Sequence, residues 1–276
     1  MAPHRMMVPR LLVADIDGTL VRSDKSLSEQ TIAAARRLMA AGVPIALISA
    51  RPPSGMLWMA QALGLTTPLA AFNGGTIIQP DGRILSAARL SPETAQQALA
   101  LIDRPGVVKW LFRAGRWHVD RLDGTHDVAE RKAANQQPIV GGDFGQLLDA
   151  VDKIVAVSED HAMLAGLEPQ VAGALGTAAT VIRSQVYYLD ITAPAANKGD
   201  GVAALAAAAG VPLAAVAAIG DQRNDMAMFR RAGLSIAMGQ GPDEVRACAM
   251  RVTGSNDEDG VAQAIDTILL PMLSAG

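Results

Sequence analysis

Two aspartates, Asp15 and Asp17, follow directly on an apolar stretch near the start of the chain, in the sequence LLVADIDGTLV. Burying a carboxylate at the end of an apolar strand is costly unless another group compensates its charge. A calcium-binding loop would need a ligand at its fifth position, glycine at its sixth and glutamate at its twelfth. Counted from Asp15, these positions hold Thr19, Leu20 and Ser26, which excludes such a loop. A pair of turn-forming aspartates stays open as a purely structural alternative.

Three further groups of polar residues stand where later strands end or helices begin. Ser49 closes the run PIALIS and precedes Ala50 and Arg51, Lys198 stands in AANKGD, and VAAIGDQRND holds Asp221, Asn224 and Asp225. In a parallel α/β sheet, ligands bind at the carboxyl ends of the strands, near a switch in strand order. We therefore expect these groups to converge with the two aspartates.

The residue types in these groups predict phosphoryl-transfer chemistry. A few carboxylates with waters and substrate phosphate are the usual way of holding Mg²⁺, and the candidate ligands are Asp15, Asp17 and Asp221. The phosphate would be held by Ser49, Lys198, Asn224 and backbone N–H groups around Gly18. An aspartate can act as nucleophile, and a carboxylate two residues later can protonate the leaving oxygen and then activate water. The metal would also neutralise the buried carboxylates.

Strand-like apolar runs alternate with helical patterns at both ends of the chain. Strands are expected at residues 11–14, 44–49, 69–72, 214–219, 234–238 and 251–253, and helices at 28–41, 54–63, 199–209, 225–232, 242–249 and 260–270. This alternation favours an α/β fold with a doubly wound, Rossmann-like parallel sheet covered by helices on both faces.

The middle of the chain differs from its two ends. Residues 107–122 alternate in a hairpin pattern whose apolar positions include Trp110, Phe112 and Trp117, which we expect to form the buried face of a sheet. Further strands are expected at 153–157 and 186–191, with a helix at 159–175 between them. The predicted organisation is a discontinuous core, residues 1–83 and 190–276, with a mixed α/β cap domain inserted at 84–189.

Composition narrows the class of protein. Half of the 276 residues are hydrophobic, 18% are charged and the net charge is −3, which gives no sign of a nucleic-acid or anionic-membrane partner. The basic N-terminal stretch MAPHRMMVPR is followed by an apolar run too short for a signal-peptide core. The only cysteine, Cys248, cannot form an internal disulfide. We expect a cytoplasmic monomer whose partner is a small phosphorylated metabolite.

Taken in order, DIDGT (15–19), the strand-end Ser49, Lys198 and GDQRND (220–225) resemble the four motifs of the haloacid dehalogenase superfamily of phosphatases. The large insertion between Ser49 and Lys198 is similar to the type IIB cap of the Cof-type subfamily, as are FNGGTI (72–77), GRIL (82–85) and NDEDGVA (256–262). The family often has Thr-Gly-Arg where this chain has Ser-Ala-Arg at 49–51, which keeps the hydroxyl and the arginine. The resemblance covers nearly the whole chain.

The resemblance implies a role for each motif residue. Asp15 would be the nucleophile and a Mg²⁺ ligand, and Asp17 the general acid and base with its backbone carbonyl on the metal. Asp221 would be the third protein ligand, and Asp225 would support the metal waters and Lys198. The implied phosphate-binding residues are Ile16, Gly18, Ser49, Ala50, Lys198 and Asn224, and the substrate-proximal ones are Arg51, Asn73 and Gly74. Arg51 could equally be solvated, and the turn at Asn73 could be structural only.

The expected function is Mg²⁺-dependent hydrolysis of phosphomonoesters of small metabolites, with sugar phosphates as the first candidates, through an aspartyl-phosphate. A phosphomutase and a sugar-phosphate binder without catalysis are the alternatives. A signalling receiver is disfavoured because it needs neither Asp17 nor a cap. A cap that closes over the site predicts hinges near residues 80–86 and 186–194.

Overall fold

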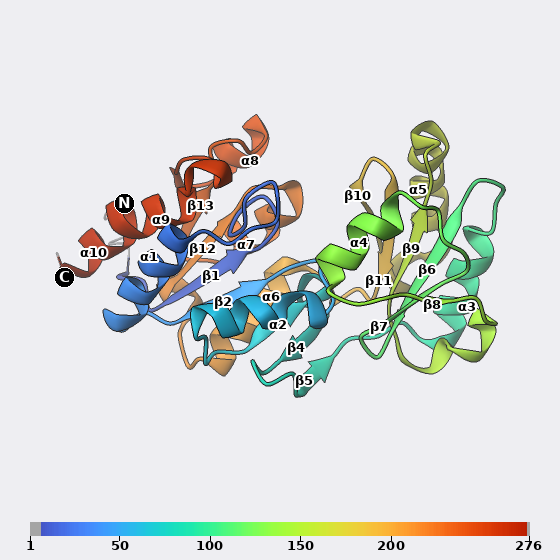
Figure 1. Cartoon of the computed structure of the whole chain (residues 1–276), viewed down its shortest axis with the longest axis horizontal. Helices are drawn as coiled ribbons and strands as arrows, with labels where there is room; N and C mark the ends of the chain where they lie inside the picture. Colours follow the sequence, from blue (N-terminus) through green and yellow to red (C-terminus); the bar gives the residue numbers. More distant parts are fainter. Residues whose placement is uncertain (1–6, 275–276) are drawn as a thin grey trace. The chain divides into compact units, whose positions relative to one another are not determined.

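The computed structural model describes residues 7–274, so part of the basic N-terminal stretch lies outside the described residues. Contacts divide the chain into two compact units (Figure 1). The first unit comprises the residues up to Ala50, Met56–Leu85 and the residues from Asn197 onward, and the second comprises Arg51–Gly55 and Ser86–Ala196. Among the described residues, no helix combines the length and apolar character that spanning a membrane requires.

An eight-stranded sheet forms the first unit, in the order β14-β13-β12-β1-β2-β3-β4-β5. The strands are β1 (Leu11–Asp15), β2 (Ile45–Ile48), β3 (Leu69–Ala71), β4 (Thr76–Ile78), β5 (Ile84–Ala87), β12 (Val216–Gly220), β13 (Leu234–Ala237) and β14 (Arg251–Val252). The pairs from β14 to β3 are all parallel, as the alternating pattern predicts. The chain runs from β1 outward to β2 and β3 and returns to β12 on the other side of β1, so the strand order reverses there.

The sheet is not wholly parallel. β4 pairs antiparallel with β3, and β5 continues the sheet beyond it. The sequence did not reveal these two strands, because Thr76–Ile78 and Ile84–Ala87 are short. β5 is also an exposed edge strand without the apolar alternation that marks a half-buried strand.

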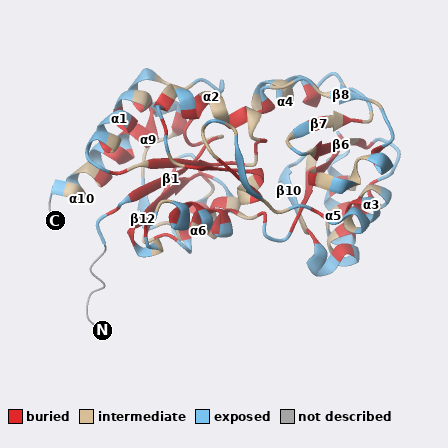
Figure 2. Cartoon of the chain, turned by 90° about the horizontal axis from the view of Figure 1, so that it is seen from below, coloured by how far each residue is buried: buried red, intermediate tan, exposed pale blue. Residues whose placement is uncertain are grey.

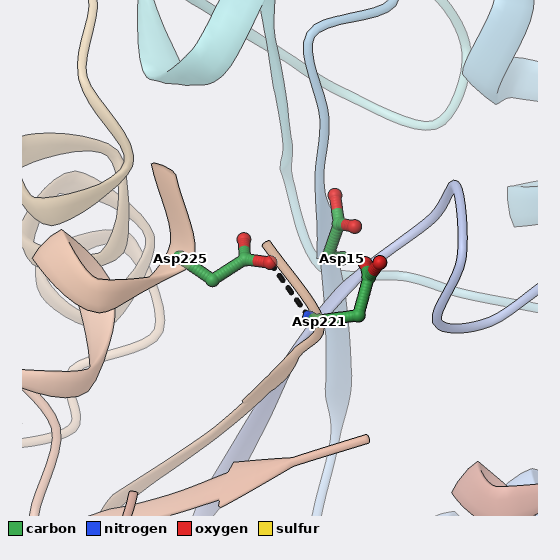
Figure 3. Close-up of side chains that lie close together, drawn as sticks. All are labelled: Asp15, Asp221 and Asp225. Carbon is green, nitrogen blue, oxygen red and sulfur yellow. Dashed lines mark hydrogen bonds between the residues drawn. The ribbon is translucent and has the colours of Figure 1, made fainter. Parts of the chain in front are cut away.

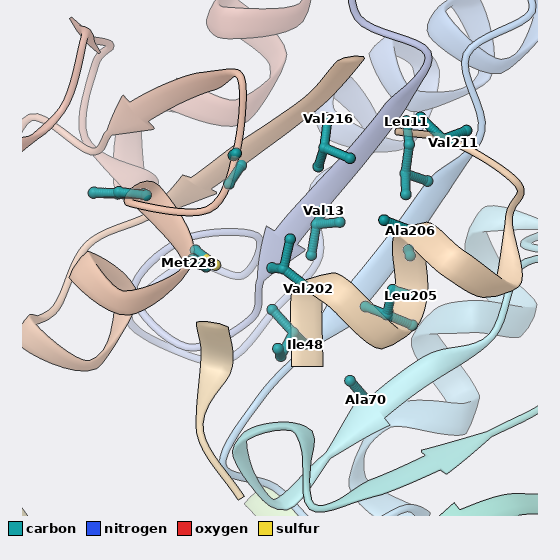
Figure 4. Close-up of a cluster of buried hydrophobic side chains, with 14 of the residues drawn as sticks. Leu11, Val13, Ile48, Ala70, Val202, Leu205, Ala206, Val211, Val216 and Met228 are labelled. Atoms are coloured by element: carbon teal, nitrogen blue, oxygen red, sulfur yellow. The ribbon is translucent and has the colours of Figure 1, made fainter. Parts of the chain in front are cut away.

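Helices cover both faces of this sheet (Figure 2). They are α1 (Glu29–Ala40), α2 (Ser54–Leu63), α6 (Lys198–Ala208), α7 (Met226–Phe229), α8 (Asp243–Cys248), α9 (Gly260–Ala264) and α10 (Leu270–Ser274), with a π-helical turn at Ile265–Leu269. On one face α6 packs against the strands, where Val202 and Leu205 meet Leu11, Val13 and Ile48 in a fully buried cluster (Figure 4). On the other face lie α1, α2 and α9. The inner parallel strands β1, β2, β3, β12 and β13 are buried on both faces, and their sequences are therefore continuous apolar runs.

The second unit contains a six-stranded sheet in the order β10-β11-β9-β6-β7-β8. Its elements are α3 (Pro92–Leu101), β6 (Val108–Arg113), β7 (Arg116–Val119), α4 (His126–Ala134), β8 (Ile139–Val140), β9 (Val151–Val157), α5 (His161–Leu175), β10 (Thr180–Gln185) and β11 (Tyr188–Thr192). β6 and β7 form the expected hairpin, and Trp110, Phe112 and Trp117 are buried, as predicted. The helices α3 and α4 and the strands β8 and β10 were not predicted.

The predicted hinge near residues 186–194 needs correction. Most of this segment is β11, which is hydrogen-bonded to β9 on one side and to β10 on the other. A strand in the middle of a sheet cannot flex without breaking both ladders. The boundary after the long second-unit segment lies later, between Ala196 and Asn197, while the boundary before that segment falls after Leu85, inside the predicted hinge 80–86.

Candidate functional site

The reversal of strand order brings the aspartate motifs together. β1 ends at Asp15 and β12 ends at Gly220, and the two strands are neighbours in register, with Ala14 opposite Ile219. Asp15 and Asp221 therefore emerge side by side from adjacent carboxyl ends (Figure 3). This is the place where α/β sheets of this kind bind ligands.

Asp15, Asp221 and Asp225 form a buried carboxylate cluster, which we call the aspartate cluster. Each residue offers one oxygen, and these oxygens all lie within 4.8 Å of one another. The three residues are only 5%, 3% and 0% exposed. Hard carboxylate oxygens converging in this way are the donor set that suits Mg²⁺ or a similar divalent cation. The residues present therefore fit a metal ion at this point.

Lys198 supplies the cluster's positive charge. Asn197 caps helix α6 by accepting a hydrogen bond from the Asp200 amide, which places Lys198 in the first turn. Its buried ammonium donates to Asp15 Oδ1 at 2.5 Å and to Asp225 Oδ1 at 2.6 Å. One ammonium for three carboxylates leaves the cluster negative, which again favours a cation.

Burial sets the protonation behaviour of this cluster. Burial raises the pKa of Asp15 well above its usual range, Lys198 opposes that rise, and the carboxylates of Asp225 and Asp221 add to it. Burial and the neighbouring Asp225 also raise the pKa of Asp221. Burial alone would lower the pKa of Lys198, but Asp15 and Asp225 outweigh it and raise that pKa. Burial and the repulsion between neighbouring carboxylates thus raise the pKa values of both Asp15 and Asp221.

The turn after β12 explains the spacing of GDQRND. Asp225 lies in a 3-10 turn (Arg223–Asp225), and its Oδ2 accepts from the amides of Asp221 and Gln222, each at 2.8 Å. A Cβ on Gly220 would lie 2.4 Å from Asp225 Cγ, so glycine is required there. The turn thus folds Asp225 back onto Asp221.

Three residues to which the sequence analysis assigned no role also hold the site together. Thr19 Oγ1 donates to Asp221 Oδ1 at 3.0 Å, and Gln222 Nε2 donates to Asp221 Oδ2 at 3.0 Å. Gln240 Nε2 donates to the carbonyl of Gly18 at 2.6 Å. Gln240 follows β13 closely, so the rule that polar groups at strand ends converge could have identified it.

The loop after β3 contributes the two asparagines. The backbone N–H of Asn73 donates to the backbone carbonyl of Ser49 at 2.7 Å, and the side-chain Oδ1 of Asn73 accepts from Asn224 Nδ2 at 3.3 Å. Within the described part of the chain, Asn224 Oδ1 is buried and has no hydrogen-bond partner. Ser49 is buried directly after β2. The predicted phosphate residues Ser49 and Asn224 are thereby linked through Asn73.

Glycines allow the close approach of this loop and helix α6. Gly74 has a φ of +98°, and a Cβ there would lie 2.7 Å from Gly201 Cα.

The Ile16 carbonyl accepts from the amides of Thr19 and Val21, which closes the loop after β1. Gly18 within this loop has a φ of +76°, and a Cβ there would lie 2.4 Å from Asp221 Oδ2.

Asp17 and Arg51 are held by partners outside the aspartate cluster. Among residues 7–274, Asp17 is not one of the carboxylates that gather there, and Lys25 Nζ contacts its Oδ1 at 2.8 Å. Arg51 groups with the second unit, although Ala50 closes a segment of the first. Its guanidinium donates to the carbonyls of Gly55 and Ala133, each at 3.2 Å. Arg51 is buried, so the solvated alternative for it is wrong.

The second unit contains a cavity of about 280 Å³ near the starts of α4 and α5. Its lining includes the carboxylates of Asp123, Glu159 and Asp160 together with His126. His126 is nearly buried, and its two ring nitrogens lie 3.4 Å from Asp123 Oδ2 and 3.5 Å from Glu159 Oε1. An acidic lining of this kind repels phosphate, so the aspartate cluster with Lys198 is the better candidate for a phosphate site.

Comparison with known proteins agrees with this geometry. The family model for haloacid dehalogenase-like hydrolases matches residues 12–265. The HMP-PP phosphatase of Cronobacter sakazakii is 31% identical over 239 residues, covering 86% of this chain and 87% of that protein. The 5-amino-6-(5-phospho-D-ribitylamino)uracil phosphatase YitU of Bacillus subtilis is 27% identical and covers 92% of this chain and 96% of its own. A crystal structure of a haloacid dehalogenase-like hydrolase from Bacteroides thetaiotaomicron superposes with a TM-score of 0.85 at 27% identity, covering 94% of this chain and 99% of that one.

Proposed function

Because this chain belongs to the haloacid dehalogenase-like hydrolases, we propose that it is a Mg²⁺-dependent phosphatase of small phosphorylated metabolites that works through an aspartyl-phosphate on Asp15. The observation that carries the proposal is the aspartate cluster with Lys198 at the reversal of strand order. Its donor set suits Mg²⁺, and its position is where α/β sheets bind ligands.

Asp15 is the proposed nucleophile. Its carboxylate oxygen attacks the phosphorus, the bond to the leaving oxygen breaks, and Asp17 gives that oxygen a proton. Asp17, now ionised, takes a proton from a water molecule as the water attacks the phosphorus. The bond from phosphorus to Asp15 breaks, inorganic phosphate leaves and both aspartates return to their starting state. Mg²⁺ held by Asp15, Asp221 and the Asp17 carbonyl would supply charge stabilisation for the transferring phosphoryl group.

Polar groups around the cluster are proposed to hold the phosphate. Lys198, Ser49 and Asn224 lie on three different segments at the same edge of the sheet, and Asn224 Oδ1 is buried without a hydrogen-bond partner among the described residues. Backbone groups of Ile16, Gly18 and Ala50 complete the proposed set. Asn73, Gly74 and Arg51 are proposed to lie next to the substrate. Asp225 anchors Lys198, to which it is hydrogen-bonded, and supports the metal waters.

The substrate class follows from the relatives. The names of the two phosphatases described above specify small phosphorylated metabolites, and a third relative at 26% identity is the pyridoxal phosphate phosphatase of Escherichia coli. We propose sugar phosphates and similar phosphomonoesters as the substrates of this chain. The inserted region at 84–189 is proposed as a cap domain on a core of 1–83 and 190–276. We propose a monomeric, cytoplasmic enzyme, in keeping with its one free cysteine.

The proposal is tested by phosphate release from p-nitrophenyl phosphate and a panel of sugar phosphates and other phosphorylated metabolites, with Mg²⁺ and with EDTA. The wild type should turn over only with the metal, and Asp15→Asn should lose activity by about 10⁴-fold or more because the nucleophile is gone. Asp81→Asn, a change at an exposed turn residue that can still accept from the Arg83 amide, serves as the control. Activity that survives EDTA or Asp15→Asn would contradict the mechanism.

A phosphomutase is distinguished in the same experiment by its products. A mutase would convert a sugar phosphate into its positional isomer without accumulating inorganic phosphate. Binding of sugar phosphates with neither product would favour a binder that lacks catalysis.

A further inference from the structure

We infer that Lys25 is the residue that positions the Asp17 carboxylate for its acid and base steps, an inference that rests on the proposed function. Lys25 Nζ lies 2.8 Å from Asp17 Oδ1. The Asp17 side chain is 35% exposed, so packing restrains it less than it restrains the aspartate cluster. An acid–base group must be held within hydrogen-bond reach of the reacting oxygen. An ammonium fixed beside it restricts its rotamers.

The backbone at Lys25 is unusual for a lysine. Lys25 has a φ of +71°, in the left-handed region that favours glycine or asparagine. Its amide donates to the Arg22 carbonyl and the Arg22 amide donates to the Ser26 carbonyl, each at 2.9 Å, which closes a tight turn. A lysine at this position costs conformational energy that glycine would avoid. The contact of its side chain with Asp17 gives a reason for that cost.

The turn is fixed from its other side. Arg22 pairs with both oxygens of Asp259, at 3.0 and 2.9 Å. The Ser23 amide and hydroxyl donate to Asp257 at 2.8 and 2.7 Å. An exposed ion pair is ordinarily weak because both side chains must be ordered to form it. Here the backbone that carries Lys25 is already ordered, so the pair serves orientation more than stability.

The test compares Lys25→Met and Lys25→Gln with Lys25→Arg, using the full chain, Mg²⁺ and a sugar phosphate that the wild type hydrolyses. Loss of the cation should lower kcat by about 10- to 100-fold with little change in KM, because a misplaced catalytic group slows the reaction without weakening ground-state binding. Lys25→Arg should recover most of the loss, since it keeps a cation within reach. Asp24→Asn, in the same turn, can still accept from the Ser26 amide and should leave kcat unchanged.

A double-mutant cycle shows whether Lys25 acts through Asp17. In an Asp17→Asn background, Lys25→Met should have no further effect on the turnover of p-nitrophenyl phosphate, whose good leaving group keeps the residual rate measurable. Equal losses in both backgrounds would overturn the inference, as would single Lys25 variants with wild-type kcat. A wild type that hydrolyses no phosphomonoester would instead refute the proposed function. Thermal melting of each variant separates a folding defect from a kinetic one.

Discussion

At the scale of single residues, the three carboxylates of the aspartate cluster repel one another, and a bound cation would offset this repulsion. Asp15, Asp221 and Asp225 share one ammonium, and burial prevents water from screening their repulsion. Asp225 is the best satisfied of the three, since it accepts from Lys198 and from two backbone amides. The repulsion should therefore fall most heavily on Asp15 and Asp221, whose pKa values are both raised.

This repulsion predicts an effect of Asp221→Asn on stability. The raised pKa of Asp221 means that the folded state holds the proton more tightly than the unfolded chain, whose aspartates have pKa values of about 3.9. The cost of ionisation is absent below that pH and grows as the pH rises through the raised folded-state pKa. In EDTA, Asp221→Asn should melt a few degrees above the wild type at about pH 7 and level with it below about pH 4.

Adding Mg²⁺ provides the control for this prediction. The ion should raise the melting temperature of the wild type by mass action and should raise that of Asp221→Asn much less. Differential scanning calorimetry at the two pH values, with and without the ion, gives all the melting temperatures. A variant that is less stable than the wild type in EDTA at about pH 7 would show that the hydrogen bonds from Thr19 and Gln222 outweigh the repulsion.

At the scale of elements, the site depends on how closely helix α6 can approach the loop at Phe72–Gly74. Gly74 and Gly201 touch backbone to backbone, and this contact sets where the N-terminus of α6, and so Lys198, meets the strand ends. The same loop carries Asn73 to Asn224. A side chain at this contact would move the helix that supplies the cluster's ammonium.

Gly74→Ala should therefore destabilise the protein by about 2–4 kcal/mol, through a strained φ and an overpacked contact. Gly64→Ala is the matched control, because Gly64 also has a positive φ, +70°, but its Cβ would meet nothing within 4 Å. The control should cost only about 1 kcal/mol. Urea unfolding measures both changes, and equal losses for the two variants would mean that the contact with α6 contributes nothing.

At the scale of the whole molecule, the chain passes between the two units at segments with different properties. The segment up to Leu85 is mostly exposed, with β5 at the sheet edge. On the return path β11 is a paired strand, and the exposed Pro194 and Ala195 lie just before Asn197. We therefore move the second proposed hinge from 186–194 to 194–197.

Hydrogen exchange tests this assignment. Amides in the segments 80–86 and 195–197, which include turn hydrogen bonds (Gly82 to Gln79, Ala196 to Ala193) and an edge strand, should exchange faster than those of Tyr188–Thr192, which two ladders protect. Mg²⁺ with orthovanadate, which imitates a transferring phosphoryl group, should slow exchange at both hinges if a cap closes over the bound phosphate. Exchange is measured by mass spectrometry of peptic fragments. Fast exchange throughout β11 would favour a hinge at 186–194 over one at 194–197.

The sequence by itself determined the fold class, the principal strands of the first unit and the identity of the motif residues. Strands buried on both faces are continuous apolar runs, and polar residues at their ends stand out against that background. The positions of Asp15, Ser49, Lys198 and Asp221 could therefore be predicted. The sequence did not predict the strands β4 and β5 or most of the second unit's helices. Their segments are short or exposed, so their hydrophobic periodicity is weak.

Only the tertiary structure decided which of these side chains meet. Asp15 and Asp17 are two residues apart, yet Asp15 joins Asp221 and Asp225 while Asp17 contacts Lys25. That division depends on the direction of each side chain after the strand ends, on the 3-10 turn that folds Asp225 back, and on the turn that carries Lys25. These directions are set by packing and hydrogen bonds between segments far apart in the sequence, such as Thr19 with Asp221 and Arg22 with Asp259. A local sequence pattern does not contain this information.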